Sequence, residues 1–299
     1  MDSLLQDIKF GSKLLWKDKG FAATAIVTLA LGIGANTAIF SVINAVLLRS
    51  LPFEEAERIV LIYNSYPGAG APRAGAAAPD YFDRLEQTDA FEEIAMYTTT
   101  GLTLGDLGTP QQVVGLDVTP SFFRLLRVEA ALGRIFSEGD AVVGDNQKAI
   151  LSQGAWRQYY GSDPGVIGRD VQLNGVAHQI VGVMRPDFYF ADREVRIYRP
   201  IAFTPDQRQA LHSNNWQQIG RLRPGATVEL AQQQINAVNG NNLQLYPGLA
   251  DALINAGFVT RVVSYQEDLV RDVRSTLYLL WGGVLFVLLI GCVNIANLV

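Results

Sequence analysis

Two long stretches without charged residues stand near the ends of the chain. The first runs from Gly20 to Leu48 and the second from Ser275 to Val299. At a rise of about 1.5 Å per residue, either stretch is long enough as a helix to cross the roughly 30 Å hydrocarbon layer of a bilayer. Residues 49–274 mix polar and apolar positions and are numerous enough to bury a core of their own. The pattern predicts two membrane-spanning helices on either side of a large extramembrane domain.

The first apolar stretch is interpreted as a span and not as a cleaved signal peptide. It is far longer than the roughly 7 to 15 residues of a signal-peptide core, and no convincing cleavage site follows it. Residues 1–19 place apolar side chains near one side of a helix and lysines elsewhere, which is typical of a segment lying in the membrane interface. A solubilising flank before the span is the alternative interpretation of these residues.

The distribution of lysine predicts the orientation of the chain. Four lysines precede the first span, whereas its far side opens with Arg49 and then three glutamates. Basic residues prefer the cytoplasmic side of a span, so the N-terminus is expected in the cytoplasm and residues 49–274 outside it. Arg271 and Arg274, just before the second span, weaken this argument.

The pattern inside the domain predicts strands with helices between them. Asn174-Gly175 is a strong signal for a two-residue hairpin turn, and Thr227 is a helix-start residue. Residues 67–79, rich in Gly, Ala and Pro, are expected to form a mobile loop, and Thr119 or Ser121 is expected to cap the helix that follows. The mixture predicts an α+β fold. Strands are predicted at 58–66, 91–104, 111–118, 148–152, 169–184, 216–223 and 258–265, and helices at 79–88, 121–127, 153–161 and from 227 onward.

Charge and cysteine content exclude some classes of function. The formal net charge is −5, and because residues 1–19 contribute +1 and the spans nothing, the domain carries −6. A domain of this sign is a poor candidate for binding nucleic acid. The single cysteine, Cys292, lies in the second span, so no intramolecular disulfide can form.

Candidate catalytic and metal-binding residues are few. Of the two histidines, His178 is expected on the exposed face of a strand and His212 in a polar loop, and neither belongs to a spaced set of metal ligands. The adjacent carboxylates Glu54-Glu55 and Glu92-Glu93 are interpreted as solvated surface, because adjacent side chains point apart. The Gly-x-Gly of residues 32–34 lies inside an uncharged span, where a phosphate loop is not expected. We therefore predict no catalytic residues, no cofactor and no metal, and expect any ATP hydrolysis on a separate subunit.

Small and polar residues recur at helical spacing within both apolar stretches. Such stripes allow two helices to approach closely and to form hydrogen bonds with each other in lipid. They predict that each span packs against other helices in a bundle. The residues assigned to this packing are Gly34, Asn36, Thr37, Ser41, Asn44, Gly291, Asn294 and Asn297.

Long stretches of the chain resemble the MacB/FtsX-like family of ABC transporter permeases. They include "FAATAIVTLALGIGANTAIFSVINAVLLRSLPF", "AILSQGAWRQYYGSDPGVIGRDVQLNGVAHQIVGVMRPDF" and "YQEDLVRDVRSTLYLLWGGVLFVLLIGCVNIANL". The resemblance implies a MacB-like periplasmic core domain with flanking spans. It also implies a porter-like lobe of strands and helices at about 50–118 and 200–270, and an inserted β-rich lobe at about 119–199. The expected parts are a cytoplasmic amphipathic segment (1–19), a first transmembrane helix (20–48), the periplasmic core domain (49–274) and a second transmembrane helix (275–299) at which the chain is truncated.

The resemblance further implies a place in the cell and a set of partners. It implies a permease subunit in the bacterial inner membrane that transmits ATP-driven motion from a cytoplasmic ABC ATPase to its periplasmic domain, for efflux or export. The implied partners are that ATPase, a second permease subunit in a homo- or heterodimer, a periplasmic adaptor and membrane lipids. Family members continue past the second span, so this chain is expected to be the N-terminal portion of a longer permease. A membrane-anchored module that binds or senses a ligand, and an anchored extracytoplasmic enzyme, are the alternative hypotheses.

Overall fold

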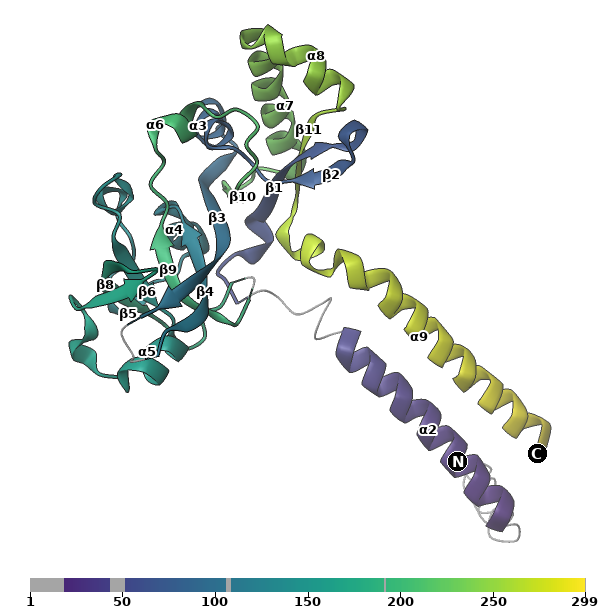
Figure 1. Ribbon diagram of the computed structural model, residues 1–299. Coiled ribbons are helices and arrows are strands. Elements are labelled where there is room, and N and C mark those ends of the chain that lie inside the picture. The colour runs from purple at the N-terminus through teal and green to yellow at the C-terminus, as the bar shows by residue number, and fades with distance from the viewer. Residues whose placement is uncertain (1–18, 44–51, 106–108, 191, 299) are drawn as a thin grey trace. The chain divides into compact units, whose positions relative to one another are not determined.

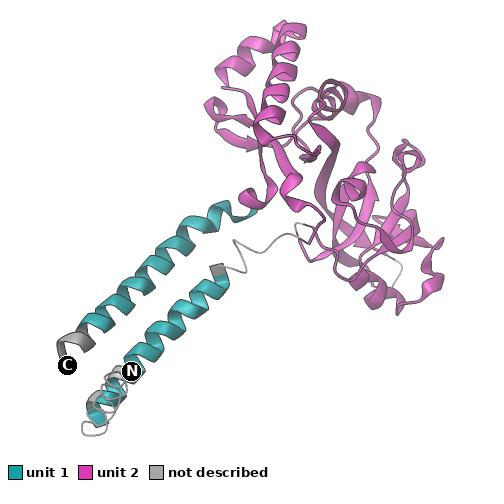
Figure 2. Ribbon diagram, turned by 180° about the vertical axis from the view of Figure 1, so that it is seen from behind, with its two compact units in different colours: residues 1–49, 269–299 teal, residues 50–268 magenta. Residues whose placement is uncertain are grey.

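The chain forms two compact units. The computed structural model describes residues 19–43, 52–105, 109–190 and 192–298. One unit comprises residues 1–49 together with 269–299, and the other comprises residues 50–268 (Figure 2).

The first unit is a pair of long apolar helices that lie side by side (Figure 1). They are α2 (Lys19–Ile43) and the part of α9 (Tyr265–Leu298) from residue 269 onward. By length and composition, Ala22–Val42 and Tyr265–Val293 are candidate membrane spans. A Cβ atom at Gly32 would lie 2.7 Å from Leu288 Cδ1, and one at Gly291 would lie 3.1 Å from Thr28 Cγ2. The helices are therefore antiparallel, and glycine on each of them allows the close approach.

The second unit is built on a mixed sheet in which eleven strands are described. The strands follow the order β11-β1-β10-β3-β4-β9-β6-β8-β5, while β2 pairs with β1, and β7 pairs with β3 and β8. Neighbours are antiparallel except for β4 with β9 and β6 with β8. The strands are β1 (Ile59–Tyr66), β2 (Ala71–Ala74), β3 (Phe91–Leu104), β4 (Gln111–Val118), β5 (Ala130–Gly133), β6 (Lys148–Leu151), β7 (Asp170–Leu173), β8 (Val176–Met184), β9 (Val195–Pro200), β10 (Gln217–Leu222) and β11 (Val259–Ser264).

Helices pack against this sheet at several places. Helix α7 lies against β11, α4 against β3, and α5 against β6, β8 and β9. The sheet and helices together confirm the predicted α+β class. The helices are α3 (Ala78–Gln87), α4 (Ser121–Leu126), α5 (Gln153–Tyr160), α6 (Pro205–Gln209), α7 (Val228–Leu245) and α8 (Pro247–Asn255), with 3-10 turns η2 (Ala56–Arg58), η3 (Pro67–Ala69), η4 (Glu138–Ala141) and η5 (Pro164–Val166).

Strong local signals predicted their elements correctly. Asn174 and Gly175 both have positive φ, 52° and 79°, which is the turn geometry that joins β7 to β8. The Thr227 side chain accepts a hydrogen bond of 3.2 Å from the Leu230 amide and so caps α7. The predicted strands at 58–66, 91–104 and 111–118 are β1, β3 and β4.

Three local predictions were wrong. Residues 67–79 include strand β2, which pairs with β1. Neither Thr119 nor Ser121 caps α4; its N-cap is Pro120, and the Thr119 hydroxyl accepts a hydrogen bond from the Met96 amide at 3.0 Å instead. His178 is only 7% exposed, because the exposed face of β8 at this point carries Ala177 and Gln179, and His178 points to the opposite, buried face.

The order of the strands bears on the predicted lobes. Strands from residues 59–118 and 217–264 lie together at one side of the sheet, and those from 130–200 lie at the other. The parallel pairing of β4 with β9 joins the two groups. The lobe boundaries at 119 and 199 stay a prediction.

A buried polar network crosses the first group of strands. The Arg84 guanidinium, 1% exposed, donates to Asn64 Oδ1 at 2.8 Å, to Thr260 Oγ1 at 3.1 Å and to Gln218 Oε1. Asp80 lies 3.9 Å from the same guanidinium and is its closest counter-charge. Burial lowers the pKa of Arg84, but arginine keeps its charge, so these oxygens must satisfy a cation away from water.

Candidate functional site

The residues assigned to helix packing do not all share one surface of α2. Gly34, Thr37 and Ser41 are exposed in the helix pair, and a Cβ at Gly34 would meet nothing within 4 Å. The less exposed positions of the described α2 are instead Ala22, Leu29, Gly32, Asn36 and Ile39. This spacing of three, four and seven residues forms the seam against α9. Of the predicted set, the structure therefore brings Asn36 and Gly291 to the pair and leaves the other three on an open face.

Hydrogen bonds within α2 satisfy part of its polar groups. Thr37 Oγ1 donates to the Ile33 carbonyl at 2.8 Å, and Ser41 Oγ to the Thr37 carbonyl at 2.8 Å. Asn36 Nδ2 donates to the Gly32 carbonyl at 2.9 Å, but its buried Oδ1 has no hydrogen-bond donor among the residues that the structure describes. Asn44 lies outside the described residues, and Asn294 and Asn297 are in α9 with side chains outside those described.

The second unit is tied at its beginning by a cluster of arginines and carboxylates. Arg127 donates to Glu54 at 2.6 Å and to Glu92 at 3.3 Å, and lies 2.6 Å from Glu55. Arg58 pairs with Glu55 and Glu92. Burial raises the pKa of Glu92, but bonds from Arg58 and Arg127 outweigh it and lower that pKa. The carboxylates that the sequence predicted as solvated surface are thus partners of arginines, and none of them is placed as an acid-base pair.

A buried arginine holds the same segment through its backbone. Arg221 on β10 is 0% exposed, and its Nη2 donates to the Glu54 carbonyl at 2.9 Å. Its Nη1 donates to the Glu55 carbonyl at 3.3 Å and its Nε to the Leu125 carbonyl. Burial lowers the pKa of Arg221, and the nearby charges of Arg127 and Arg58 lower it further. One side chain therefore joins the start of the unit to β10 and to the end of α4.

Both ends of the unit meet on one aromatic ring. Phe190, in the connection between β8 and β9, stacks on Tyr265 with ring centroids 5.3 Å apart and planes 5° apart. The same ring lies 6.2 Å from the Phe53 ring. Phe190 is itself held edge-on by Tyr97 at 5.0 Å and Phe122 at 4.9 Å, within the largest apolar core. Phe53 comes just after the first apolar stretch and Tyr265 begins α9, so residues at both connections to the spans rest on one buried side chain.

The first turn of α9 has a second attachment. Arg73 on β2 forms two hydrogen bonds with Asp268, of 2.6 and 2.5 Å. The Arg73 guanidinium also lies over the Tyr63 ring, 4.7 Å from its centroid. An arginine that pairs bidentately and stacks on a ring is fixed in orientation, so it ties the first turn of α9 to β2.

We call the residues Phe53, Glu54, Glu55, Arg127, Phe190, Arg221, Tyr265 and Asp268 the junction. Sequence analysis did not assign them a function. Their partners are far away in the chain, and no spacing rule connects Arg221 or Phe190 to the ends of the domain. The location of Phe53 and Tyr265 next to the apolar stretches was the one signal that could have found them.

A sequence model of the MacB-like periplasmic core domain matches residues 22–238. This match spans most of the chain, including most of α2 and strands β1 to β10, and ends before Tyr265 and Asp268 of the junction. The chain belongs to the MacB-like periplasmic core domain family. This domain is a component of ABC-type permeases and not their ATPase. The family and the two apolar helices indicate a membrane-anchored protein.

Solved structures share this fold at low sequence identity. A domain of a putative permease protein from Porphyromonas gingivalis is 18% identical, with a TM-score of 0.53, and the match covers 71% of this chain and 93% of that one. The periplasmic region of MacB from Actinobacillus actinomycetemcomitans is 13% identical, with a TM-score of 0.51 and coverages of 73% and 94%. The extracellular domain of the noncanonic ABC-type transporter YknZ from Gram-positive bacteria is 11% identical, with a TM-score of 0.50 and coverages of 69% and 99%. No curated protein sequence matches the chain.

Proposed function

We propose that this MacB-like chain is a permease subunit that transmits ATP-driven movement from a cytoplasmic ABC ATPase to its extracytoplasmic domain, for efflux or export. The observation that carries the proposal is the contact of Phe53 and Tyr265 with the same ring, Phe190. A domain on flexible tethers would absorb helix movement in its linkers. A domain whose two ends rest on one core residue moves as a body when its helices move.

The open face of α2 supports a larger bundle. Gly34, Thr37 and Ser41 remain exposed when α2 pairs with α9, and Asn36 Oδ1 has no donor within the described residues. An exposed stripe of small residues in lipid is suited to a further helix, which could also supply a donor. We assign this face to helices of the same permease or of a second permease subunit.

The proposal also includes the orientation of the chain in the membrane and a periplasmic adaptor as a partner. The N-terminus faces the cytoplasm, where the ATPase docks, and the domain lies in the periplasm of a bacterial inner membrane. A periplasmic adaptor contacts the domain. The lysines before the first span and the family to which the chain belongs support this arrangement.

Co-purification and coupled hydrolysis test the proposal together. The tagged full chain, extracted in detergent from its host, is expected to recover an ABC ATPase and to stimulate its hydrolysis of ATP after reconstitution into nanodiscs. Tyr265→Ala is expected to reduce that stimulation, because it removes the ring that connects α9 to Phe190. Tyr189→Ala is the matched control, since Tyr189 is the adjacent but more exposed aromatic and its ring faces Arg193.

Three results would contradict the proposal. Absence of any ABC ATPase from the purified complex would remove the motor. Equal loss of stimulation in the two tyrosine variants would indicate a general effect on the domain and not on the junction. Labelling that places residues of the domain, such as Val142, in the cytoplasm would reverse the orientation.

A further inference from the structure

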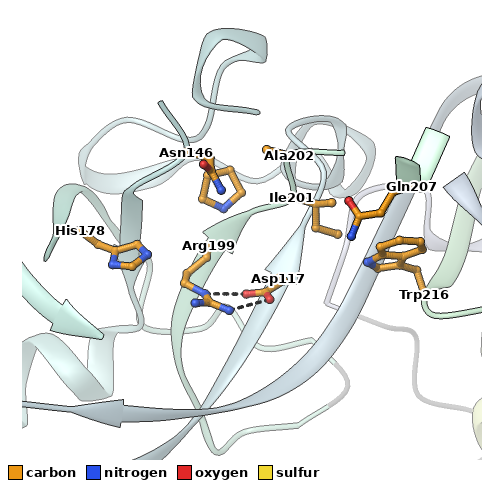
Figure 3. A pocket seen from close by; sticks show the side chains of 9 residues that line it. Asp117, Asn146, His178, Arg199, Ile201, Ala202, Gln207 and Trp216 are labelled. Atoms are coloured by element: carbon orange, nitrogen blue, oxygen red, sulfur yellow. Dashed lines mark hydrogen bonds and ion pairs between the residues drawn. The ribbon is translucent and has the colours of Figure 1, made fainter. Parts of the chain in front are cut away.

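A polar cavity of about 220 Å³ lies where the two groups of strands meet. Asp117 from β4 and Arg199 from β9 lie at the centre of its lining, with His178 on one side and Gln207 and Trp216 on the other (Figure 3). At about 30 Å³ of liquid volume per water molecule, the space corresponds to roughly seven waters or one small solute. The junction residues do not line it.

The charges that line this cavity cancel. Asp117 and Arg199 are directly paired residues of the parallel strands β4 and β9. Arg199 Nε and Nη2 donate to the two Asp117 carboxylate oxygens, each at 2.8 Å. This geometry leaves Arg199 Nη1 with no bond to another described residue and leaves lone pairs on both carboxylate oxygens. The pair can therefore offer a donor and an acceptor at once.

Two neutral side chains add donors on one side. Gln207 Oε1 accepts a hydrogen bond of 2.9 Å from the Thr204 amide, which fixes the side-chain amide and leaves its Nε2 to donate. The Trp216 indole has a donor only, and Figure 3 shows its nitrogen on the edge that faces Gln207 and Asp117. Trp216 is buried and packs edge-on against Phe203 at 5.2 Å, so this edge is held in place.

His178 adds an acceptor on the opposite side. Its Nδ1 lies 2.9 Å from the Val176 carbonyl, and because a carbonyl only accepts, Nδ1 carries the hydrogen. Burial lowers the pKa of His178, and the charge of Arg199 lowers it further, although the Val176 bond and Asp117 act in the opposite direction. The ring is thus neutral at pH 7, with Nε2 as an acceptor.

We propose that this cavity binds a small zwitterionic solute of the size of an α-amino acid. Its carboxylate contacts Arg199 and its ammonium group contacts Asp117, with the acceptor of His178 on one side of this pair and the donors of Gln207 and Trp216 on the other. A net anion or cation is disfavoured because the lining has no net charge with which to balance it. An apolar solute is disfavoured because it would leave buried polar groups without partners.

The residues that line the cavity come from two parts of the domain. His178 belongs to the group of strands from residues 130–200, whereas Gln207 is in α6 and Trp216 directly precedes β10. A bound solute would bridge these two parts of the domain and stabilise one arrangement of them. The inference does not depend on ATP-driven transmission, since binding requires no ATPase.

Binding to the full chain in nanodiscs, measured by saturation-transfer NMR, tests the site. The probes are L-alanine, propionate and ethylamine, which carry both charges, only the negative charge and only the positive charge. Wild-type protein is expected to bind alanine at least about tenfold more tightly than either single-charge probe, the effect of one lost charge-assisted hydrogen bond. Asp117→Asn should weaken alanine by a similar factor and strengthen propionate, because Arg199 loses its counter-charge.

A matched variant separates the site from general effects. Asp163→Asn removes an ion pair with Arg169 that is outside the cavity and should leave alanine binding unchanged. The double variant Asp117→Arg with Arg199→Asp restores a pair of zero net charge and should recover preference for alanine over propionate. No binding of alanine by the wild type, which means a cavity filled by water only, would overturn the proposal. A loss in Asp163→Asn equal to that in Asp117→Asn, or an unchanged probe preference in Asp117→Asn, would also overturn it.

Discussion

Phe190 and Tyr265 stack face to face, with ring planes 5° apart, although 74 residues of sequence lie between them. Tyr265 is the first residue of α9, which runs to Leu298. Phe190 in turn contacts Tyr97 and Phe122 of the core. The first residue of α9 is therefore anchored in the main apolar core of the domain.

Arg221→Met is expected to lower the free energy of unfolding of the domain by about 3 kcal/mol, because three backbone carbonyls lose their buried donor. Urea unfolding of the full chain in detergent, followed by circular dichroism, measures the change. Arg223→Met is the control: Arg223 is two residues away, exposed, and donates to the single carbonyl of Phe91 at 3.0 Å. An equal loss in the two variants would show that Arg221 has no special role.

Arg84→Met should also destabilise the domain, by about 3 to 5 kcal/mol, because Asp80 loses its nearest cation, Gln218 Oε1 loses its donor and Asn64 Oδ1 loses one of its two. The coupled ATPase activity per folded molecule should remain, since this network is not part of the junction. Thermal unfolding and activity measured on the same preparation separate the two effects. Normal stability in this variant would contradict the role assigned to Arg84.

Asp140 provides a dependence of stability on pH. Burial raises the pKa of its carboxyl, but bonds from Arg134 and from the Ser137 amide and hydroxyl outweigh this and lower it to about 2. The carboxylate therefore stabilises the fold fully above its ordinary pKa of about 3.9, and this contribution disappears as the pH falls through about 2.

Asp140→Asn should consequently cost about 1 to 3 kcal/mol at pH 7, and the difference from wild type should shrink between pH 4 and pH 2. Urea unfolding at several pH values measures it. A difference that stays constant over this range would contradict the assignment.

The helix pair gives a prediction in which two glycines behave differently. Gly32→Leu should weaken the pairing of α2 with α9, because its Cβ would lie 2.7 Å from Leu288 Cδ1. Gly34→Leu should leave the pair intact, since nothing lies within 4 Å of that position. Because the open face of α2 is assigned to packing against further helices, Gly34→Leu should reduce association between copies of the chain. Light scattering in detergent measures this as a smaller share of dimer. If the two substitutions had equal effects on the α2–α9 pairing and on the share of dimer, the assignment of Gly32 and Gly34 to separate faces of α2 would be contradicted.

The sequence predicted those elements of the fold that are determined by neighbouring residues. Asn174-Gly175 and Thr227 act on their own neighbours, so the hairpin and the start of α7 were predicted correctly. The prediction for His178 was wrong because alternation does not say which face of a strand meets the core. Ala177 and Gln179 take the exposed face of β8, and His178 takes the buried one.

The junction could not be predicted, because its contacts join residues that are far apart in the chain. Glu54 meets Arg127 and the buried Arg221 only after β10 has paired with β1 and β3. Likewise, the stripe of small residues in α2 indicated packing but not which face meets α9. Gly32, inside the motif first considered for phosphate, turned out to be the glycine in contact with Leu288.

The most direct test of transmission is the ATP-driven movement of the domain. A spin label at Val142→Cys, in a Cys292→Ser background, reports the spacing of two copies in a nanodisc complex with the ABC ATPase; Val142 is exposed and Cys292 is the only native cysteine. The account predicts that ATP changes this spacing in the labelled protein that keeps Tyr265. In the labelled protein that also carries Tyr265→Ala, the change is abolished while hydrolysis of ATP continues. An unchanged spacing in the labelled protein that keeps Tyr265, or the same change in the Tyr265→Ala variant, would contradict the account.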